Sequence, residues 1–183
     1  MRVIAGKARR LILRSVPGFD TRPTLDKIKE TLFNILAPYI SGSSFLDLFS
    51  GSGSIGIEAL SRGSVFCVFV ENDHKAVSCI KENLEHTGLS DNTLILGKNV
   101  LSGINELSIR KYHFDIVYID PPYDAGCEEE VLTALACSGI IDPDTQVIIE
   151  ADRHNDLEFI NDSDFYVFRV KDYKTNKHYF LRL

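Results

Sequence analysis

The chain has 183 residues, of which 44% are hydrophobic and 25% are charged, and its formal net charge at neutral pH is −6. This composition is typical of a soluble globular protein with one domain and a small appendage, and it excludes collagen-like, disordered and low-complexity chains. The longest apolar runs are far shorter than the ~18 residues that span a bilayer, and the N-terminus holds no apolar segment of signal-peptide length, so we expect a cytoplasmic protein without membrane contact.

The first 30 residues are basic, unlike the rest of the chain. They hold eight Lys or Arg and three Asp or Glu, whereas the remaining 153 residues hold 12 and 23. A basic surface on an acidic body attracts phosphate groups while the body stays soluble. Residues 9–13 resemble a short strand that pairs with residues 2–5. On charge alone, this segment is either a polyanion-binding surface or a solvated face without a partner.

A helix is predicted from Thr24 to Pro38, where apolar residues recur at helical spacing and the proline should end it. Strands and helices alternate after it. The predicted strands are 44–49, 65–71, 93–96, 114–119 and 146–150, and the predicted helices are 54–62, 73–86 (closed by Gly88) and 128–137. Residues 165–170 and 178–183 form a final antiparallel pair. This order predicts an α/β fold with a mostly parallel, Rossmann-like sheet of seven strands, because wholly apolar strands such as 65–70 are buried between helices.

The cysteines and histidines show no metal-binding pattern. The four cysteines, at positions 67, 79, 127 and 137, contain no CxxC pair, and the five histidines lack the spacing of paired ligands. We therefore expect reduced, mostly buried thiols and no metal site.

A glycine-rich turn follows the strand at 44–49. Gly51, Gly53 and Gly56 spell GxGxxG where a strand passes into a helix, which is the place where such sheets bind ligands. Asp47 stands at the strand end, and Glu71 ends the next strand, where a carboxylate can bind both ribose hydroxyls. The pattern fits an adenosine-containing cofactor, either a dinucleotide or S-adenosylmethionine, or else a plain connection between a strand and a helix.

A second motif, Asp120-Pro121-Pro122-Tyr123, directly follows the strand at 114–119. The two prolines remove backbone donors and stiffen the turn. The Asp120 carboxylate and the Pro121 carbonyl can then accept hydrogen bonds from the two N–H groups of a base's exocyclic amine. Tyr123 can stack on the ring of that base. The alternative is a strand-ending turn with an exposed tyrosine.

Together these motifs resemble S-adenosylmethionine-dependent amino-methyltransferases, and more narrowly the bacterial 16S rRNA guanine-966 N2-methyltransferase family. The resemblance runs nearly end to end, and its N-terminal block is the most discriminating part. Its marks are MRVIAG at 1–6, TRPT at 21–24, KETLFNIL at 29–36, DLFSGSG at 47–53, GIEALSRG at 56–63 and DPPY at 120–123.

The resemblance implies S-adenosylmethionine as cofactor and 16S rRNA of an assembling or assembled small ribosomal subunit as partner. It implies a methyltransferase catalytic domain at 41–183 and an RNA-contacting extension at 1–40. The implied catalytic residues are Asp120, Pro121 and Tyr123. The implied cofactor-binding residues are Asp47, Phe49, Gly51, Gly53, Glu71 and Asn99, the last contacting the adenine amine. The implied RNA-binding residues are Arg9, Arg10, Arg14 and Arg22.

Three other functions remain open at this point. A DNA adenine-N6 or cytosine-N4 methyltransferase uses the same DPPY chemistry, but it usually needs an additional target-recognition region. A nicotinamide dehydrogenase would explain GxGxxG but not residues 120–123. A non-catalytic RNA-binding module would explain only the basic N-terminus.

Overall fold

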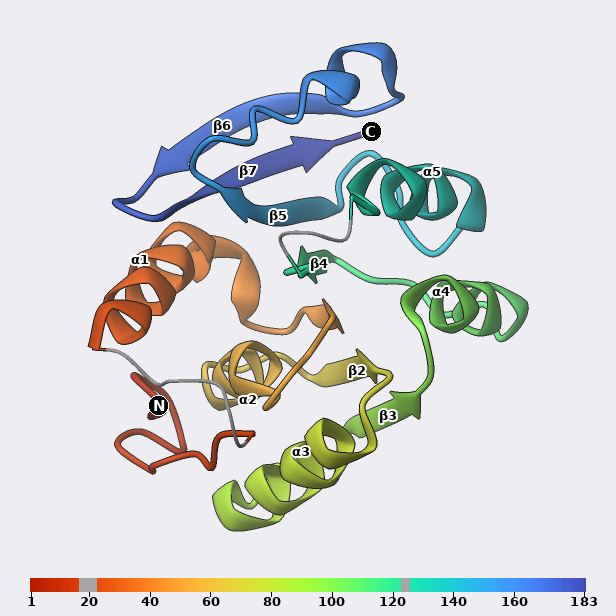
Figure 1. Cartoon of the computed structure of the whole chain (residues 1–183). Helices are drawn as coiled ribbons and strands as arrows, with labels where there is room; N and C mark the ends of the chain where they lie inside the picture. Colours follow the sequence, from red (N-terminus) through yellow and green to blue (C-terminus); the bar gives the residue numbers. More distant parts are fainter. Residues whose placement is uncertain (17–22, 123–125) are drawn as a thin grey trace.

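The computed structural model of the chain describes residues 1–16, 23–122 and 126–183 (Figure 1). Its strands are β1 (Ser44–Leu48), β2 (Phe66–Glu71), β3 (Thr93–Gly97), β4 (Ile116–Ile119), β5 (Gln146–Asp152), β6 (Tyr166–Asp172) and β7 (Asn176–Arg182). Its helices are α1 (Pro23–Ile40), α2 (Ser54–Ser61), α3 (His74–Thr87), α4 (Val100–Ile109), α5 (Glu128–Ser138) and the short 3-10 helix η1 (Glu158–Asp162).

Within the described residues, the strands form one seven-stranded sheet in the order β3-β2-β1-β4-β5-β7-β6. The first five strands pair in parallel, while β7 pairs antiparallel with both β5 and β6. The predicted mostly parallel sheet with a C-terminal antiparallel hairpin is therefore confirmed. β1 lies between β2 and β4 and pairs with β4 in parallel. The segments that follow β1 and β4 therefore lie side by side at the carboxyl ends of the strands.

Helices cover both faces of the sheet. Figure 1 shows α1, α2 and α3 on one side and α4 and α5 on the other. The first layer packs Phe33 of α1 against Phe45 of β1, with a centroid separation of 6.4 Å. The second layer packs the apolar faces of α4 and α5 against the opposite side chains of the same strands. The wholly apolar strands noted in the sequence are thus buried on both faces, as parallel strands usually are.

The helices of the structure differ from the predicted helices in two respects. α1 does not end at Pro38 but continues to Ile40. Leu36 and Ile40, on either side of the proline, are both buried in the core, and this packing outweighs the ~3 kcal/mol that a proline costs inside a helix.

The second difference is that α4 and η1 were not predicted from the sequence. The sequence holds a signal for α4, since Val100, Ile104 and Leu107 are buried at helical spacing behind a capping residue, Asn99. The helix η1 has only five residues, too few to show a period. Among the described residues, no helix combines the length and apolarity needed to cross a membrane.

The N-terminal segment folds back on itself, but residues 9–13 do not form the predicted strand, because Arg9 and Arg10 lie in a turn. Arg2 and Ile12 form an antiparallel bridge, and the Val3 amide donates to Leu11 O at 2.9 Å. The pairing extends no further than this bridge and its flanking hydrogen bonds, because the chain reverses within residues 6–10.

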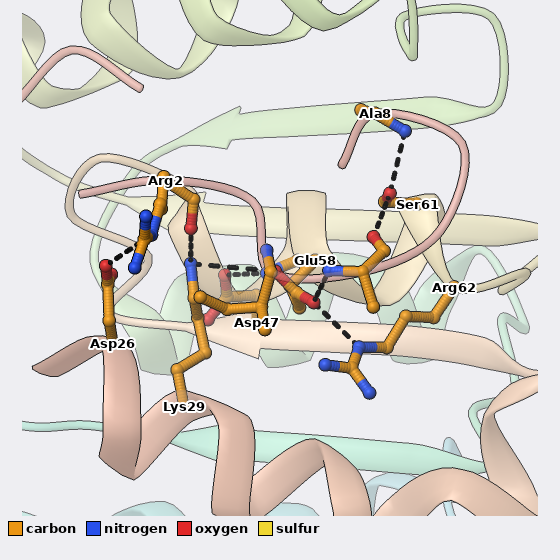
Figure 2. A network of polar contacts seen from close by, with 11 residues as sticks. Arg2, Ala8, Asp26, Lys29, Asp47, Glu58, Ser61 and Arg62 are labelled. Carbon is orange, nitrogen blue, oxygen red and sulfur yellow. Dashed lines mark hydrogen bonds and ion pairs between the residues drawn. The ribbon is translucent and has the colours of Figure 1, made fainter. Parts of the chain in front are cut away.

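A buried carboxylate attaches this segment to α2 (Figure 2). Glu58 is fully buried and accepts hydrogen bonds from Ile4 N at 2.7 Å, Ala5 N at 3.0 Å and Arg62 Nε at 2.7 Å. The ammonium of Lys29 lies 3.7 Å from the same carboxylate. The N-terminal segment is therefore held against the sheet domain by charge-assisted hydrogen bonds.

Close packing continues at the next residues. Gly6 has φ +83° and touches α2 so closely that a Cβ would lie 1.8 Å from Ser61 O. Ser61 also donates to Ala5 O at 2.6 Å and accepts from Ala8 N at 3.0 Å. Only glycine fits at position 6, which explains the glycine of the MRVIAG block in physical terms.

Candidate functional site

The turn between β1 and α2 has an unusual backbone. Gly51 and Gly53 adopt left-handed conformations, with φ of 53° and 76°, and so does Phe49, with φ of 60°. A left-handed conformation at a residue other than glycine is strained, and such strain concentrates at functional sites. The position where a Cβ of Gly51 would stand has no heavy atom within 4 Å. The turn thus leaves open space above its backbone for a ligand.

Two carboxylates hold this turn in place. Asp47 Oδ2 accepts from Gly56 N at 2.9 Å, and Glu71 Oε2 accepts from Gly51 N at 2.8 Å. The other oxygen of Glu71 accepts from Asp73 N at 2.9 Å. The structure thus places Glu71 beside the glycine-rich turn, and its contact with ribose stays a prediction.

Asp47 is an ionisable group in an apolar place. Its side chain is buried, and burial raises its pKa to about 8, against the opposing effect of the hydrogen bond from Gly56 N. A carboxyl whose pKa is higher in the folded than in the unfolded state binds an extra proton on folding. Its contribution to stability is therefore complete below its ordinary pKa of about 4 and is lost as the pH rises through 8.

This leads to a test with Asp47→Asn, which keeps the shape and the acceptor but does not titrate. Between pH 5 and pH 8 the wild type should lose stability relative to the variant, by on the order of 1 kcal/mol per pH unit, and the difference should level off above pH 8. Urea unfolding of both proteins at several pH values measures it. Parallel curves would mean that Asp47 is already ionised in the folded protein at pH 5.

The second motif begins where β4 ends. Asp120 N donates to Leu48 O at 3.4 Å, which brings Asp120 next to the end of β1. Pro121 is buried, whereas the Asp120 side chain is exposed. The surrounding protein and the carboxylates of Glu150 and Asp47 raise the pKa of Asp120, and contact of its side chain with water moderates this effect. Tyr123 lies outside the described residues.

Asn99 lies at the same sheet edge, between β3 and α4. Its side chain is exposed, and its Oδ1 caps α4 by accepting from Ser102 N at 2.8 Å. The oxygen that the sequence assigns to an adenine amine therefore already has one donor. A carbonyl oxygen has a second lone pair, so the adenine contact stays a prediction.

A buried polar network behind Asp120 was not predicted. Glu150 of β5 accepts from the Tyr118 hydroxyl at 2.6 Å and lies 3.0 Å from His178 Nε2, and its other oxygen accepts from Asn176. Burial alone would raise the pKa of Glu150, but hydrogen bonds with His178, Tyr118 and Asn176 lower it overall. The network holds β4, β5 and β7 together beneath Asp120. Its only sequence signals are a glutamate and a histidine within apolar strands.

Of the basic N-terminal residues assigned to RNA binding, Arg14 is held by α3. Arg9, Arg10 and Arg14 are all exposed. The backbone of Arg14 is held by Asn83, which accepts from its N at 2.8 Å and donates to its O at 3.1 Å. The same Asn83 amide donates to Ser52 O at 2.9 Å. One buried asparagine thus connects the basic segment to the glycine-rich turn, whereas Arg22 lies outside the described residues.

Two further features concern the cysteines and a groove on the surface. The four cysteines are free, and in the described ranges no group of three or more His, Cys, Asp or Glu side chains is placed to bind a metal. An open groove of about 660 Å³ lies between α4 and α5, with Leu101, Glu130 and Cys137 in its lining. The groove includes neither Asp120 nor the glycine-rich turn.

Comparison with known proteins gives consistent matches. A family model described as conserved hypothetical protein 95 matches residues 1–182. YlbH of Bacillus subtilis (strain 168), named as a candidate rRNA methyltransferase, is 38% identical over 157 residues, which are 86% of this chain and 85% of that protein. Ribosomal RNA small subunit methyltransferase D of Haemophilus influenzae is 34% identical over 158 residues, which are 86% of this chain and 81% of that protein.

A solved structure extends the match to the fold. The candidate methyltransferase yhhF of Escherichia coli has a TM-score of 0.84 with this chain at 30% identity, and the match covers 100% of this chain and 97% of that one. The predicted Rossmann-like fold of a methyltransferase is thereby confirmed.

Proposed function

Because the chain belongs to the conserved hypothetical protein 95 family, together with relatives named as rRNA small subunit methyltransferases, we propose that it methylates 16S rRNA of the small ribosomal subunit with S-adenosylmethionine. The relatives named as rRNA methyltransferases support the resemblance drawn from the sequence motifs. The finer part of the proposal is the acceptor atom, which is the exocyclic N2 of a guanine, the one at position 966 by that resemblance.

One observation carries the proposal. The glycine-rich turn and the Asp120-Pro121-Pro122 segment follow neighbouring parallel strands, β1 and β4, and are joined by the hydrogen bond from Asp120 N to Leu48 O. A donor bound over the turn therefore lies next to an amine held at the prolines. Ligands of such sheets bind at the carboxyl ends of the strands.

The residues present fit the cofactor. The open space above Gly51 allows a ligand to approach the backbone, and the Glu71 carboxylate beside it can accept from ribose hydroxyls. When bound, S-adenosylmethionine supplies a methyl carbon on a sulfonium, whose carbon–sulfur bond breaks as the amine attacks in line. The proposed contacts to it come from Asp47, Phe49, Gly51, Gly53, Glu71 and Asn99.

The chain's own contribution to the reaction is orientation. Asp120 and the Pro121 carbonyl accept the two amine N–H bonds and direct the nitrogen lone pair toward the methyl carbon, while Tyr123 stacks on the base. Positioning of this kind contributes up to ~7–11 kcal/mol to lowering a barrier. Asp120 also stabilises the positive charge that develops on nitrogen, and its raised pKa favours acceptance of the departing proton.

The basic extension at 1–40 is proposed to hold the RNA, with 41–183 as the catalytic domain. Arg9, Arg10, Arg14 and Arg22 would contact phosphates. The base must leave its stack to reach Asp120, as other enzymes that modify bases require.

The test incubates the protein and labelled S-adenosylmethionine with undermethylated small subunits, naked 16S rRNA, and DNA of matched sequence. We expect label in the small-subunit RNA, and mass mapping should place it on a guanine N2. Label in DNA would favour the adenine-N6 or cytosine-N4 alternative. Absence of turnover with every acceptor would favour a non-catalytic RNA-binding module.

Arg22→Ala should weaken RNA binding about tenfold, because one phosphate contact is lost, and should lower the salt dependence of binding by about one unit of slope. Calorimetric affinity for S-adenosylmethionine should not change. Filter binding to 16S rRNA at several salt concentrations measures the effect. RNA affinity equal to that of wild type would remove Arg22 from the proposed interface.

A further inference from the structure

The outer strand of the C-terminal hairpin exposes aromatic and apolar side chains. β6 is one of the two edge strands of the described sheet and packs on β7 and η1 (Figure 1). Tyr166 is 53% exposed and Phe168 is 43% exposed, whereas the exposed Val170 pairs with Tyr179 and therefore faces the other side of the sheet. Exposed aromatic side chains grouped on a sheet surface commonly mark an interaction site.

The same hairpin is basic, although the chain as a whole is acidic. Residues 165–183 carry a single acidic residue, Asp172. Their basic residues are Arg169, Lys171, Lys174, Lys177 and Arg182. The chain therefore has a second cationic segment, separate from the N-terminal one.

The cations lie against the aromatic rings. The Arg182 guanidinium is 5.1 Å from the centroid of the Phe168 ring, and Lys171 Nζ is 5.9 Å from that of Tyr173. A register shift between Val167 and Arg169 places Phe168 at an irregularity of the strand. Such irregularities re-aim a side chain and interrupt a regular edge.

The register places the turn of this hairpin at the carboxyl ends of the parallel strands, where Asp120 also lies. Asn176, the first residue of β7, pairs with Asp152 at the carboxyl end of β5, and Asp172 at the end of β6 pairs with Lys177. Arg153, which follows β5, binds the hairpin turn through Thr175 O and Lys174 O, each at 3.3 Å. The end of the sheet where β4 passes into Asp120 therefore also carries Lys171, Lys174 and Arg153.

We propose that the exposed side of β6 and the turn of the β6–β7 hairpin bind a single-stranded segment of the substrate RNA. Bases stack on Tyr166 and Phe168, and phosphates lie against Arg169, Lys171 and Lys174. Stacking rings combined with cations are the usual means of binding unpaired strands. This inference rests on the proposed function and adds a second RNA contact to that of the N-terminal extension.

The charge decides against a second copy of the chain as the occupant. Pairing β6 with its equivalent in another molecule would bring Arg169 and Lys171 against the same residues of that strand. Like charges across a strand pair destabilise it, and cations on an edge strand protect the edge from such pairing. RNA brings the opposite charge.

The experiment measures binding of a fluorescein-labelled single-stranded oligoribonucleotide of mixed sequence by anisotropy, with the corresponding duplex for comparison. The triple variant R169Q/K171Q/K174Q should lower affinity for the single strand at least tenfold and reduce the slope of log affinity against log salt by about 2. Phe168→Ala should lower it about tenfold with little change in slope, because stacking and not charge is lost.

Matched controls are Lys111→Gln and Ile109→Ala, an exposed cation and an exposed apolar residue at the end of α4, which should leave affinity unchanged. The triple variant replaces surface charges only, so it stays informative if Phe168→Ala unfolds. Wild-type affinity and salt slope in the triple variant would overturn the proposal. So would a wild-type dimer, seen by sedimentation, that dissociates in the variants without a change in RNA affinity.

The two proposals fail in different ways. Methyl incorporation by the wild type tests the function, whereas the anisotropy comparison needs no turnover. If wild type methylates small-subunit RNA and the hairpin variants bind RNA as it does, only the hairpin proposal falls.

Discussion

Asp120→Ala is expected to reduce the rate of methyl transfer to small-subunit RNA by 100-fold or more while the protein stays folded. The variant removes the carboxylate that orients the amine and stabilises the charge developing on nitrogen. Loss of one such preorganised group typically costs 10²–10³ in rate. Because the Asp120 side chain is exposed, its removal leaves no buried cavity, and stability should be nearly unchanged.

Two further variants sharpen this result. Asp120→Asn keeps one carbonyl acceptor but lacks the charge, so its rate should fall between those of wild type and Asp120→Ala. Asp91→Ala changes an exposed aspartate before β3 and should have the wild-type rate. The rates come from label transferred at saturating S-adenosylmethionine, with calorimetry to show that cofactor affinity is kept. Wild-type turnover by Asp120→Ala would disprove the acceptor role.

Among the variants proposed here, Glu58→Ala should lower the free energy of unfolding most, by on the order of 3–5 kcal/mol. Removing one partner of a buried ion pair leaves the other charge uncompensated, and here Lys29 would stay buried against Arg2 O, 2.8 Å away. The amides of Ile4 and Ala5 would also lose their acceptor. Burial already lowers the pKa of Lys29, against the opposing effect of Glu58, and loss of this carboxylate should lower that pKa further.

Urea unfolding gives the free energy for this variant and for Glu82→Ala as a control. Glu82 pairs with Arg14 at the surface, where an ion pair contributes ~0–1 kcal/mol. Hydrogen exchange should show the Ile4 and Ala5 amides losing protection in Glu58→Ala. If both variants lost equally little stability, Glu58 would not be what attaches the N-terminal segment to α2.

Apart from α4 and η1, the order of the elements could be read from the sequence because its signals are local. Val65 to Val70 form an apolar run, Asp73 and Gly88 bound a helix, and the glycine-rich and proline-rich motifs each follow a strand. Each of these features depends on a few adjacent residues. For the same reason the two motifs could be placed at the carboxyl ends of strands without knowledge of the strand order.

The tertiary structure alone decided what these motifs rest on. Glu58 meets Ile4 across 54 positions, and Glu150 meets His178 across 28. A glutamate in a sequence looks the same whether it lies in water or in the core, since its burial depends on distant partners. The continuation of α1 through Pro38 was decided in the same way, by packing that local propensity does not contain. The local sequence thus indicated most of the elements and both motifs, whereas long-range contacts determined how the site and its basic extension are held together.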